Sequence, residues 1–334
     1  MADAKFDVLT IGNAIVDVFA KVDDAFLTAE GMDKSIMHLV DAERSEYLYS
    51  RLPGDPQHIS GGSCCNTAVG VTSLGGNGAF IGKVAEDDLG AIYRKDLTKA
   101  GVAYNTPTLI HGTSTARSMI VITPDGERTM NTYLGACQEL TVADMDEDLI
   151  SSSALTFMEG YLWDPPEAKR AFVKAGELAH KHGQKTGITL SDPFCVARFR
   201  DEFIALLRNK TMDVLLANDE EIKSLYQVSD LNEAIAAVQQ DCSTVAITLG
   251  AKGALAIKDG VVSQVPAFKV EQVEDVTGAG DLFASGFLYG LARGQSMEQS
   301  LSLGCLCASE VISHVGARPN VSLKALAQNH DLAL

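Results

Sequence analysis

The sequence predicts an α/β protein whose main sheet is mostly parallel and covered by helices on both faces. Short apolar segments alternate with helical patterns along the chain, as expected for strands that are buried on both sides. Two other stretches alternate apolar and polar residues, which is typical of a more exposed antiparallel sheet. We therefore expect a large α/β core together with a second, smaller sheet.

The core strands are predicted where apolar runs end near a glycine or a polar residue. Helical patterns separate these runs, and the clearest begins at Pro166 and ends at Gly183, with acidic residues early and basic residues late. The segments predicted as strands are 6–12, 79–84, 154–160, 185–190, 212–217 and 243–248.

The small sheet is predicted from residues 14–58 and 106–136, which do not follow this alternation of apolar strands and helices. Within the second stretch, Ala116–Thr123 reads as a strand and Pro124–Glu127 as a hairpin turn. Because these two stretches are inserted into an α/β pattern, we expect them to form a lid over a site. The large core then comprises residues 1–13, 59–105 and 137–334.

Composition and charge narrow the class of protein. The chain of 334 residues has a net charge of −17, which argues against nucleic acid or an anionic membrane as a partner. No apolar run approaches the roughly 20 residues of a membrane span. The seven Cys, with no apolar signal segment after Met1, predict reduced thiols and a cytoplasmic protein.

The segment Asp275–Asp281 carries the strongest chemical signal. Gly278, Ala279 and Gly280 leave amide groups uncovered at the start of a helical pattern, where an anion is favoured. Asp281 follows directly. A carboxylate that accepts a hydroxyl proton, beside amides that hold a phosphoryl group, is suited to phosphorylating an alcohol. The alternative is a glycine-rich turn with an Asp that caps the helix.

Five segments together resemble the ribokinase-like (PfkB) family of carbohydrate and nucleoside kinases. They occur in the family's order and span residues from about 11 to 318. The resemblance implies a three-layer α/β/α core with a small β-sheet lid, the cofactors ATP and Mg²⁺, and a monovalent cation such as K⁺. The segments are 11–17, 61–68 with 73–76, 218–221, 248–253 and 275–287.

The resemblance assigns catalytic roles to two regions. It makes Asp281 the general base and Gly278-Ala279-Gly280 the anion hole for the transferred phosphoryl group. Arg128 belongs to the predicted lid, and its planar guanidinium suits phosphate oxygens that it would reach on closure. The alternative for Arg128 is an ordinary charge on a surface hairpin.

The acceptor is expected between the first strand and the helix that follows Gly62. Asn13 and Asp17 lie near the mouth of the sheet, and a carboxylate at that place can accept hydrogen bonds from two vicinal hydroxyls. The resemblance places Gly61, Gly62 and Asn66 around the same sugar. An ordinary helix start there is compatible with this role.

The nucleotide is expected at two further motifs. By resemblance, Asn218 and Glu221 lie near the phosphates, where Glu221 orders water bound to Mg²⁺ instead of binding the metal directly. The alternative is that the pair forms a capping box. Thr248, Gly250 and Gly253 match the family's nucleotide loop.

Three features resemble the adenosine kinases of the family. Ser63 follows the glycine pair, Tyr161 offers a ring to stack on a purine, and Leu134 with Ala136 lies on the strand predicted to cover the base. We therefore expect phosphorylation of the 5′ hydroxyl of a nucleoside, adenosine to AMP, by a monomer or homodimer. The alternatives are a sugar kinase for ribose, fructose or 2-keto-3-deoxygluconate, and a non-catalytic ligand-binding protein on the same fold.

Overall fold

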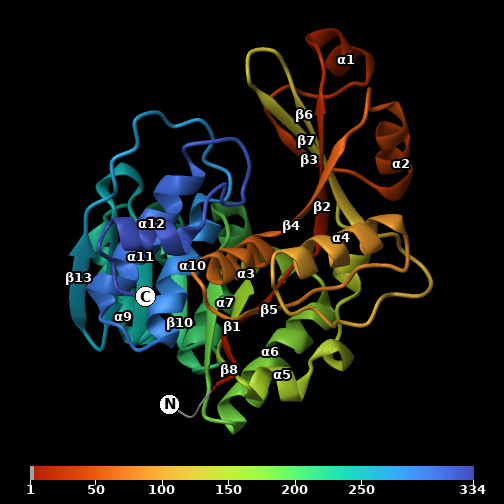
Figure 1. The fold of residues 1–334 in the computed structure, drawn as a ribbon. Helices are drawn as coiled ribbons and strands as arrows, with labels where there is room; N and C mark the ends of the chain where they lie inside the picture. The colour runs from red at the N-terminus through yellow and green to blue at the C-terminus, as the bar shows by residue number, and fades with distance from the viewer. Residues whose placement is uncertain (1–3) are drawn as a thin grey trace.

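The computed structural model describes residues 4–334, so the first three residues of the predicted core segment 1–13 lie outside it. Within the described residues the chain forms two sheets, one of eight strands and one of five. The small sheet extends away from one side of the large α/β part (Figure 1). This arrangement confirms the predicted fold class of an α/β core with a second, small sheet.

The large sheet is mostly parallel. Its strands are β1 (Phe6–Ile11), β5 (Gly78–Ile81), β8 (Ser153–Glu159), β9 (Lys185–Thr189), β10 (Val214–Asn218), β11 (Thr244–Thr248), β12 (Ala254–Lys258) and β13 (Val261–Val265). They lie in the order β13-β12-β11-β10-β9-β8-β1-β5. The six parallel strands are those that the apolar segments predict. The two antiparallel strands at the edge, β12 and β13, were not predicted.

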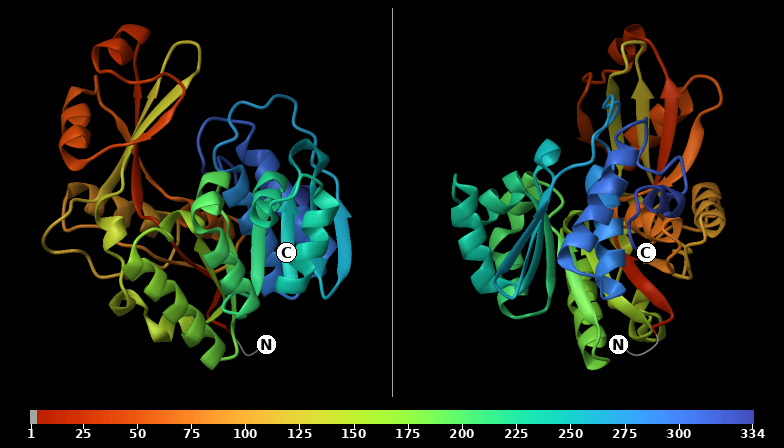
Figure 2. Two further views of the ribbon diagram at one scale, coloured as in Figure 1. Left: turned by 180° about the vertical axis from the view of Figure 1, so that it is seen from behind. Right: turned by 60° about the vertical axis from the view of Figure 1, so that its left-hand side comes forward.

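Helices cover both faces of this sheet (Figure 2). Neighbouring strand residues such as Val8 and Leu9 are both fully buried but belong to opposite clusters, because successive side chains point to opposite faces. One face carries α3 (Ser63–Ser73), α4 (Asp88–Lys99), α10 (Ala279–Ala292), α11 (Met297–Val311) and α12 (Leu323–Asn329). The other carries α5 (Glu147–Ser151), α6 (Pro166–Lys181), α7 (Pro193–Arg208), α8 (Asp219–Tyr226) and α9 (Leu231–Asp241).

Four short 3₁₀ helices complete the connections. They are η1 (Gly135–Glu139), η2 (Val142–Asp144), η3 (Gly160–Leu162) and η4 (Gly250–Lys252). The helix predicted from Pro166 is present as α6, with Pro at its start and basic residues in its last turn. Among residues 4–334, no helix has both the length and the apolar character needed to cross a bilayer. The seven Cys are buried and free.

The small sheet comes from the two predicted insertions. Its strands are β2 (Ile15–Lys21), β3 (Met37–Leu39), β4 (Gln57–Gly61), β6 (Ala116–Ile122) and β7 (Arg128–Tyr133), joined by α1 (Asp24–Ala29) and α2 (Ala42–Arg51). Strand order is β3-β7-β6-β2-β4, with both parallel and antiparallel pairs. The sheet is therefore mixed, whereas the sequence pattern predicts an antiparallel one. Strand β4 also continues past the predicted boundary at residue 58, to Gly61.

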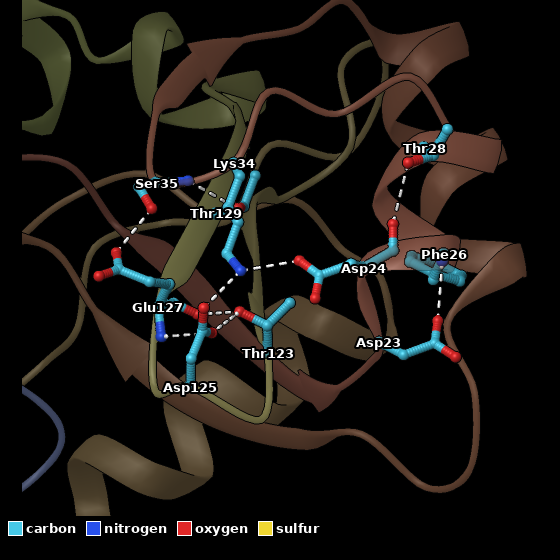
Figure 3. Close-up of polar contacts among 10 residues, drawn as sticks. All are labelled: Asp23, Asp24, Phe26, Thr28, Lys34, Ser35, Thr123, Asp125, Glu127 and Thr129. Atoms are coloured by element: carbon cyan, nitrogen blue, oxygen red, sulfur yellow. Dashed lines mark hydrogen bonds and ion pairs between the residues drawn. The ribbon is translucent and has the colours of Figure 1, made fainter.

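Polar contacts hold the tip of the small sheet together. The Lys34 ammonium lies 2.7 Å from an Asp24 carboxylate oxygen and 2.5 Å from one of Asp125, so it links α1 to the β6–β7 hairpin (Figure 3). Ser35 donates its amide to the Thr129 hydroxyl and its own hydroxyl to Glu127. These contacts join both insertions at the tip, so we expect the small sheet to move as one unit.

Candidate active site

A cavity of about 450 Å³ lies between the two sheets, at the carboxyl ends of the parallel strands. Open α/β sheets commonly bind ligands at this edge, and the volume is typical of small-molecule sites. The small sheet contributes Asp17, Ser118, Ile120 and Met130 to its wall. From the core, the predicted residues in the wall are Gly62, Ser63, Asn66, Tyr161, Asn218, Glu221, Thr248, Gly278, Ala279, Gly280 and Asp281.

Asp281 occupies the first turn of α10 and is held by two side chains of α3. One carboxylate oxygen accepts a hydrogen bond from the Ser63 hydroxyl at 2.6 Å, and the other accepts one from the Asn66 amide at 2.9 Å. Burial raises the pKa of Asp281, while Ser63, Asn66 and the charge of Arg318 act in the opposite direction. The carboxylate is therefore fixed in orientation and more basic than an exposed Asp.

Gly278 and Gly280, which precede Asp281, are each favoured as glycine for a different structural reason. Gly278 has a φ of +80°, and a Cβ atom there would lie 2.7 Å from the Cα atom of Ala317. At Gly280, a Cβ atom would meet no atom within 4 Å outside its own stretch of helix, so open space adjoins the first turn. The Ala279 amide donates to the Val276 carbonyl at 3.2 Å, which leaves the amides of Gly278 and Gly280, with the helix dipole, to favour an anion in that space.

A second cavity, of about 700 Å³, adjoins the first at this helix start. Thr248, Ala279 and Gly280 line both cavities, and the predicted nucleotide-loop residues Gly250 and Gly253 line the second. Side chains that line the second cavity and were not predicted include Phe268, Cys305 and Ile312. Two ligands can thus meet at the Gly278–Gly280 amides, one from each cavity.

Asp17 faces the first cavity from β2. Burial raises the pKa of its carboxyl to about 7, although the charges of Arg318 and Arg128 lower it. Within residues 4–334, the carboxylate accepts no hydrogen bond, so it can accept bonds from a ligand. A Cβ atom at Gly61 on the adjacent strand β4 would collide with this carboxylate. Gly61 lies outside the cavity wall and makes room for Asp17.

Asn13 and Glu159 form a buried hydrogen-bonded pair next to the start of α3, and neither is among the residues that line the first cavity. Asn13 is buried, and both its backbone and side-chain nitrogens donate to one oxygen of Glu159, at 3.0 and 2.6 Å. The other Glu159 oxygen accepts the Cys64 amide at the start of α3. Burial raises the pKa of Glu159 to about 7. Glu159 was not predicted from the sequence, although a carboxylate at the end of an otherwise apolar strand is an available signal.

Arg128 lies at the start of β7 and reaches the core. Its Nη1 atom is 2.6 Å from a carboxylate oxygen of Asp275, and both side chains are largely buried. The reading of Arg128 as an ordinary surface charge is therefore wrong. Its Nη2 atom is buried and has no hydrogen-bond partner among the described residues, and Arg128 is not among the residues that line the two cavities.

Asn218 and Glu221 form a reciprocal capping box at the start of α8. The Asn218 side chain accepts the Glu221 amide at 2.8 Å, and Glu221 accepts both nitrogens of Asn218, at 3.0 and 2.7 Å. Burial raises the pKa of Glu221 to about 7. The capping reading is correct, and both residues also line the first cavity.

The Glu221 carboxylate is suited to an indirect contact with a metal ion, through water. Throughout residues 4–334, no set of three or more His, Cys, Asp and Glu side chains is placed to hold a metal ion. Each Glu221 oxygen keeps a free lone pair for a water molecule, and Mg²⁺ usually keeps several waters. Mg²⁺ thus fits here through water and nucleotide phosphates.

Leu134 and Ala136 are not brought to the cavity. Strand β7 ends at Tyr133, and Gly135, with a φ of +43°, turns the chain into η1. A Cβ atom at Gly135 would collide with the Ser114 carbonyl, so the strand cannot continue with an ordinary residue. Ala136 is fully buried elsewhere. The prediction that these residues cover a base is therefore corrected: the small-sheet residues in the wall are Ser118, Ile120 and Met130, with Asp17.

Tyr161 in η3 forms part of the cavity wall and remains 44% exposed. Its hydroxyl donates to the Ser191 carbonyl at 3.2 Å, and its amide donates to the Ser191 hydroxyl at 3.1 Å. These contacts fix the position of the residue. The ring is therefore held beside the cavity instead of being packed into the core.

Arg318, in the loop between α11 and α12, is a second residue that was not predicted from the sequence. Its Nε atom donates to the side-chain oxygen Oδ1 of Asn66 at 2.8 Å. An Arg in a Gly-Ala-Arg-Pro loop has no distinctive spacing, so only the fold places it beside Asp17 and Asp281.

The buried carboxyls predict how stability depends on pH. Asp17, Glu159 and Glu221 each have a pKa raised to about 7, whereas unfolded carboxyls titrate near 4. Between these values the folded protein binds more protons, so stability falls as pH rises from about 4 to 7. Urea unfolding without ligand should therefore show lower stability at pH 8 than at pH 5. Asp17→Asn should recover at least about 1 kcal/mol at pH 8. A stability that rises over this window, or no gain in the variant, would contradict the assignment.

The chain is similar to known proteins over more than nine-tenths of its length. The sequence model for pfkB family carbohydrate kinases matches residues 32–324. Adenosine kinase from Saccharomyces cerevisiae is 27% identical over 332 residues, covering 92% of this chain and 95% of that protein. Among solved structures, adenosine kinase from Sinorhizobium meliloti is 49% identical with a TM-score of 0.89, covering 98% of this chain and 100% of that one. A probable sugar kinase from Rhizobium etli is 47% identical with a TM-score of 0.90, covering 99% and 100%.

Proposed function

This chain belongs to the pfkB family of carbohydrate kinases, and we propose that it phosphorylates the 5′ hydroxyl of a nucleoside, adenosine, to give AMP. Family membership makes the protein a phosphotransferase that acts on a hydroxyl group, with ATP as the donor. The identity of the acceptor is the part that we infer. The observation that carries it is that the wall of the first cavity combines the Asp17 carboxylate with aromatic and apolar side chains.

The polar part of the wall suits a ribose. Asp17, with a carboxylate that accepts no hydrogen bond from the described residues, suits the vicinal 2′ and 3′ hydroxyls. The wall also includes Tyr161, Phe157, Ile120 and Met130, which offer flat or apolar surface. A base can stack there, whereas a free sugar has hydroxyls for which these side chains provide no partners.

Under this proposal, Asp281 acts as the base. It accepts the proton of the acceptor hydroxyl as that oxygen bonds to the γ-phosphorus of ATP, and the bond to the β–γ bridging oxygen breaks to release ADP. The amides at the start of α10 stabilise the negative charge of the phosphoryl group. Ser63 and Asn66 keep the carboxylate aimed at the cavity.

The donor lies in the second cavity under this proposal. Its apolar walls suit an adenine, and its shared boundary at Ala279 and Gly280 brings the phosphates to the anion hole. Mg²⁺, when bound, neutralises charge on the phosphates, and Glu221 would hold it through water. Arg128 would donate its free Nη2 to a phosphate oxygen. Dependence on a monovalent cation such as K⁺ stays a prediction.

The decisive experiment is an ADP-release assay with a panel of acceptors. Adenosine, other nucleosides, ribose, fructose and 2-keto-3-deoxygluconate are each supplied with ATP and Mg²⁺. We expect adenosine to give the highest kcat/KM. The similarity to a probable sugar kinase makes a sugar the second candidate, so preferred turnover of a sugar would overturn the nucleoside assignment and leave the kinase class intact.

Tyr161→Ala tests the base site separately. If the ring stacks on a purine, its loss should weaken nucleoside binding by about 1–3 kcal/mol. Any residual turnover of a free sugar should change little, because a sugar has no flat face. The measurement is kcat/KM for adenosine and for ribose in both proteins, with thermal melts as the control. A lower melting temperature with unchanged substrate preference would instead make Tyr161 a purely structural residue.

A further inference from the structure

Arg318 connects the loop before α12 to β4 and to the start of α3. Its Nε atom donates to the side-chain oxygen Oδ1 of Asn66 at 2.8 Å. Its Nη2 atom donates to the Ser60 carbonyl and, at 2.9 Å, to the Ser60 hydroxyl, and it lies 3.2 Å from the Cys65 sulfur. Ser60 belongs to β4 of the small sheet, while Asn66 and Cys65 belong to α3.

These contacts determine which way the Asn66 amide faces. Its oxygen accepts from Arg318, so its NH₂ group points at Asp281 and donates to the carboxylate at 2.9 Å. If the amide were turned over, its NH₂ would face the guanidinium and its oxygen would face the carboxylate. One hydrogen bond would then be replaced by a contact between two donors, and the other by a contact between two acceptors. The guanidinium therefore selects the amide orientation that supports Asp281.

The charge of Arg318 also acts on the same carboxylate. The ionisable groups around Asp281 include Asp17 on β2, Glu159 at the end of β8, the Cys64 thiol on α3 and Tyr161 in η3. Each of these is neutral or negative, whereas Arg318 is positive and lowers the pKa of both Asp17 and Asp281. Arg128 also lowers the pKa of Asp17.

We propose that Arg318 is a positioning residue for phosphoryl transfer, which orients Asn66 and keeps the Asp281 carboxylate aligned and charged for proton removal. This inference rests on the proposed role of Asp281 as the base. Arg318 is expected to act on turnover through Asp281, without touching the acceptor oxygen itself. Its loss should therefore change kcat and its pH dependence more than the KM for ATP.

The test compares Arg318→Met, Arg318→Lys and a matched control, Arg293→Met. Arg293 lies at the C-terminal end of α10, the helix whose first turn holds Asp281, and its Nε atom is 2.7 Å from a carboxylate oxygen of Asp7; it lines neither cavity. In the ADP-release assay with adenosine, Arg318→Met should lower kcat at least about tenfold at pH 7. The acid limb of its kcat–pH profile should move up by at least about 0.5 unit. Arg293→Met should change neither, whatever its melting temperature.

Arg318→Lys separates orientation from charge. It keeps the positive charge but loses the planar fork, so the acid limb should stay near its normal position while kcat falls. In an Asn66→Ala background, Arg318→Met should cost clearly less in kcat than in the intact protein, because part of its effect passes through the Asn66 amide.

The outcomes test the role of Arg318 separately from the proposed role of Asp281 as the base. If Arg318→Met behaves like Arg293→Met, with an unmoved acid limb and equal kcat, the inference is wrong even when Asp281→Asn is inactive. If Asp281→Asn keeps normal turnover, the proposed base itself is wrong. If adenosine is not a substrate, the same profiles are measured with whichever acceptor of the panel releases ADP.

Discussion

Asp281→Asn is expected to lower kcat at least about 100-fold, the usual scale for a lost general base, while KM for adenosine and ATP changes only a few-fold. Asn has nearly the shape of Asp, so the start of α10 and both cavities should persist. It cannot accept a proton from the acceptor hydroxyl. The loss should therefore appear in turnover, which is measured by ADP release at saturating substrates.

The control for this variant is its thermal melting temperature, which reports whether it folds. Burial raises the pKa of Asp281, so removing the charge should leave the thermal melting temperature unchanged or higher. An Asp281→Asn protein that melts normally and binds adenosine but does not turn over would support the mechanism. Near-normal turnover in a correctly folded variant would eliminate Asp281 as the base.

Asp17→Ala is expected to raise KM for the acceptor and to leave KM for ATP unchanged. A carboxylate that holds two hydroxyls should contribute about 2–4 kcal/mol, because charged hydrogen bonds are each worth about 1.5–3 kcal/mol and do not add fully. The location of Asp17 on β2, in the wall of the first cavity but not the second, restricts its effect to the acceptor.

A matched comparison for Asp17 uses the acceptor itself. 2′-Deoxyadenosine and 3′-deoxyadenosine each lack one hydroxyl of the diol, so each should lose affinity in the wild type and lose little more in Asp17→Ala. If KM rises for ATP while that for adenosine stays fixed, Asp17 does not hold the sugar.

Much of the core could be predicted from the sequence because each buried strand is marked by residues within its own segment. The six parallel strands are buried on both faces, so they appear as continuous apolar runs. The edge strand β13 was missed because Val261 and Val262 are exposed and follow no clear apolar pattern. The mixed pairing of the small sheet was also missed, since strand direction depends on long-range connections that residue alternation does not encode.

The position of a residue in the cavity wall was predictable where a motif combines chemistry with a backbone requirement. Asp281 and its glycines fall in this class, and Gly280 adjoins open space in which the proposed anion hole would hold its ligand. Glu159 and Arg318 act through partners that are distant in sequence, and only the fold brings them together. Leu134 and Ala136 were assigned wrongly because Gly135 was read as a strand residue, whereas its positive φ ends the strand.

The two sheets contribute different parts of the cavity, and this division bears on how acceptors change during evolution. Ser118, Ile120 and Met130 belong to the small sheet, whereas Asp281 and the glycines before it belong to α10 of the core. If the first cavity holds the acceptor as proposed, substitutions on β6 and β7 alter which acceptor fits while the proposed phosphoryl-transfer groups stay intact. A duplicated gene could acquire a new substrate through a few changes on one surface. Similar full-length relatives named for adenosine and for sugar are the expected result of such a history.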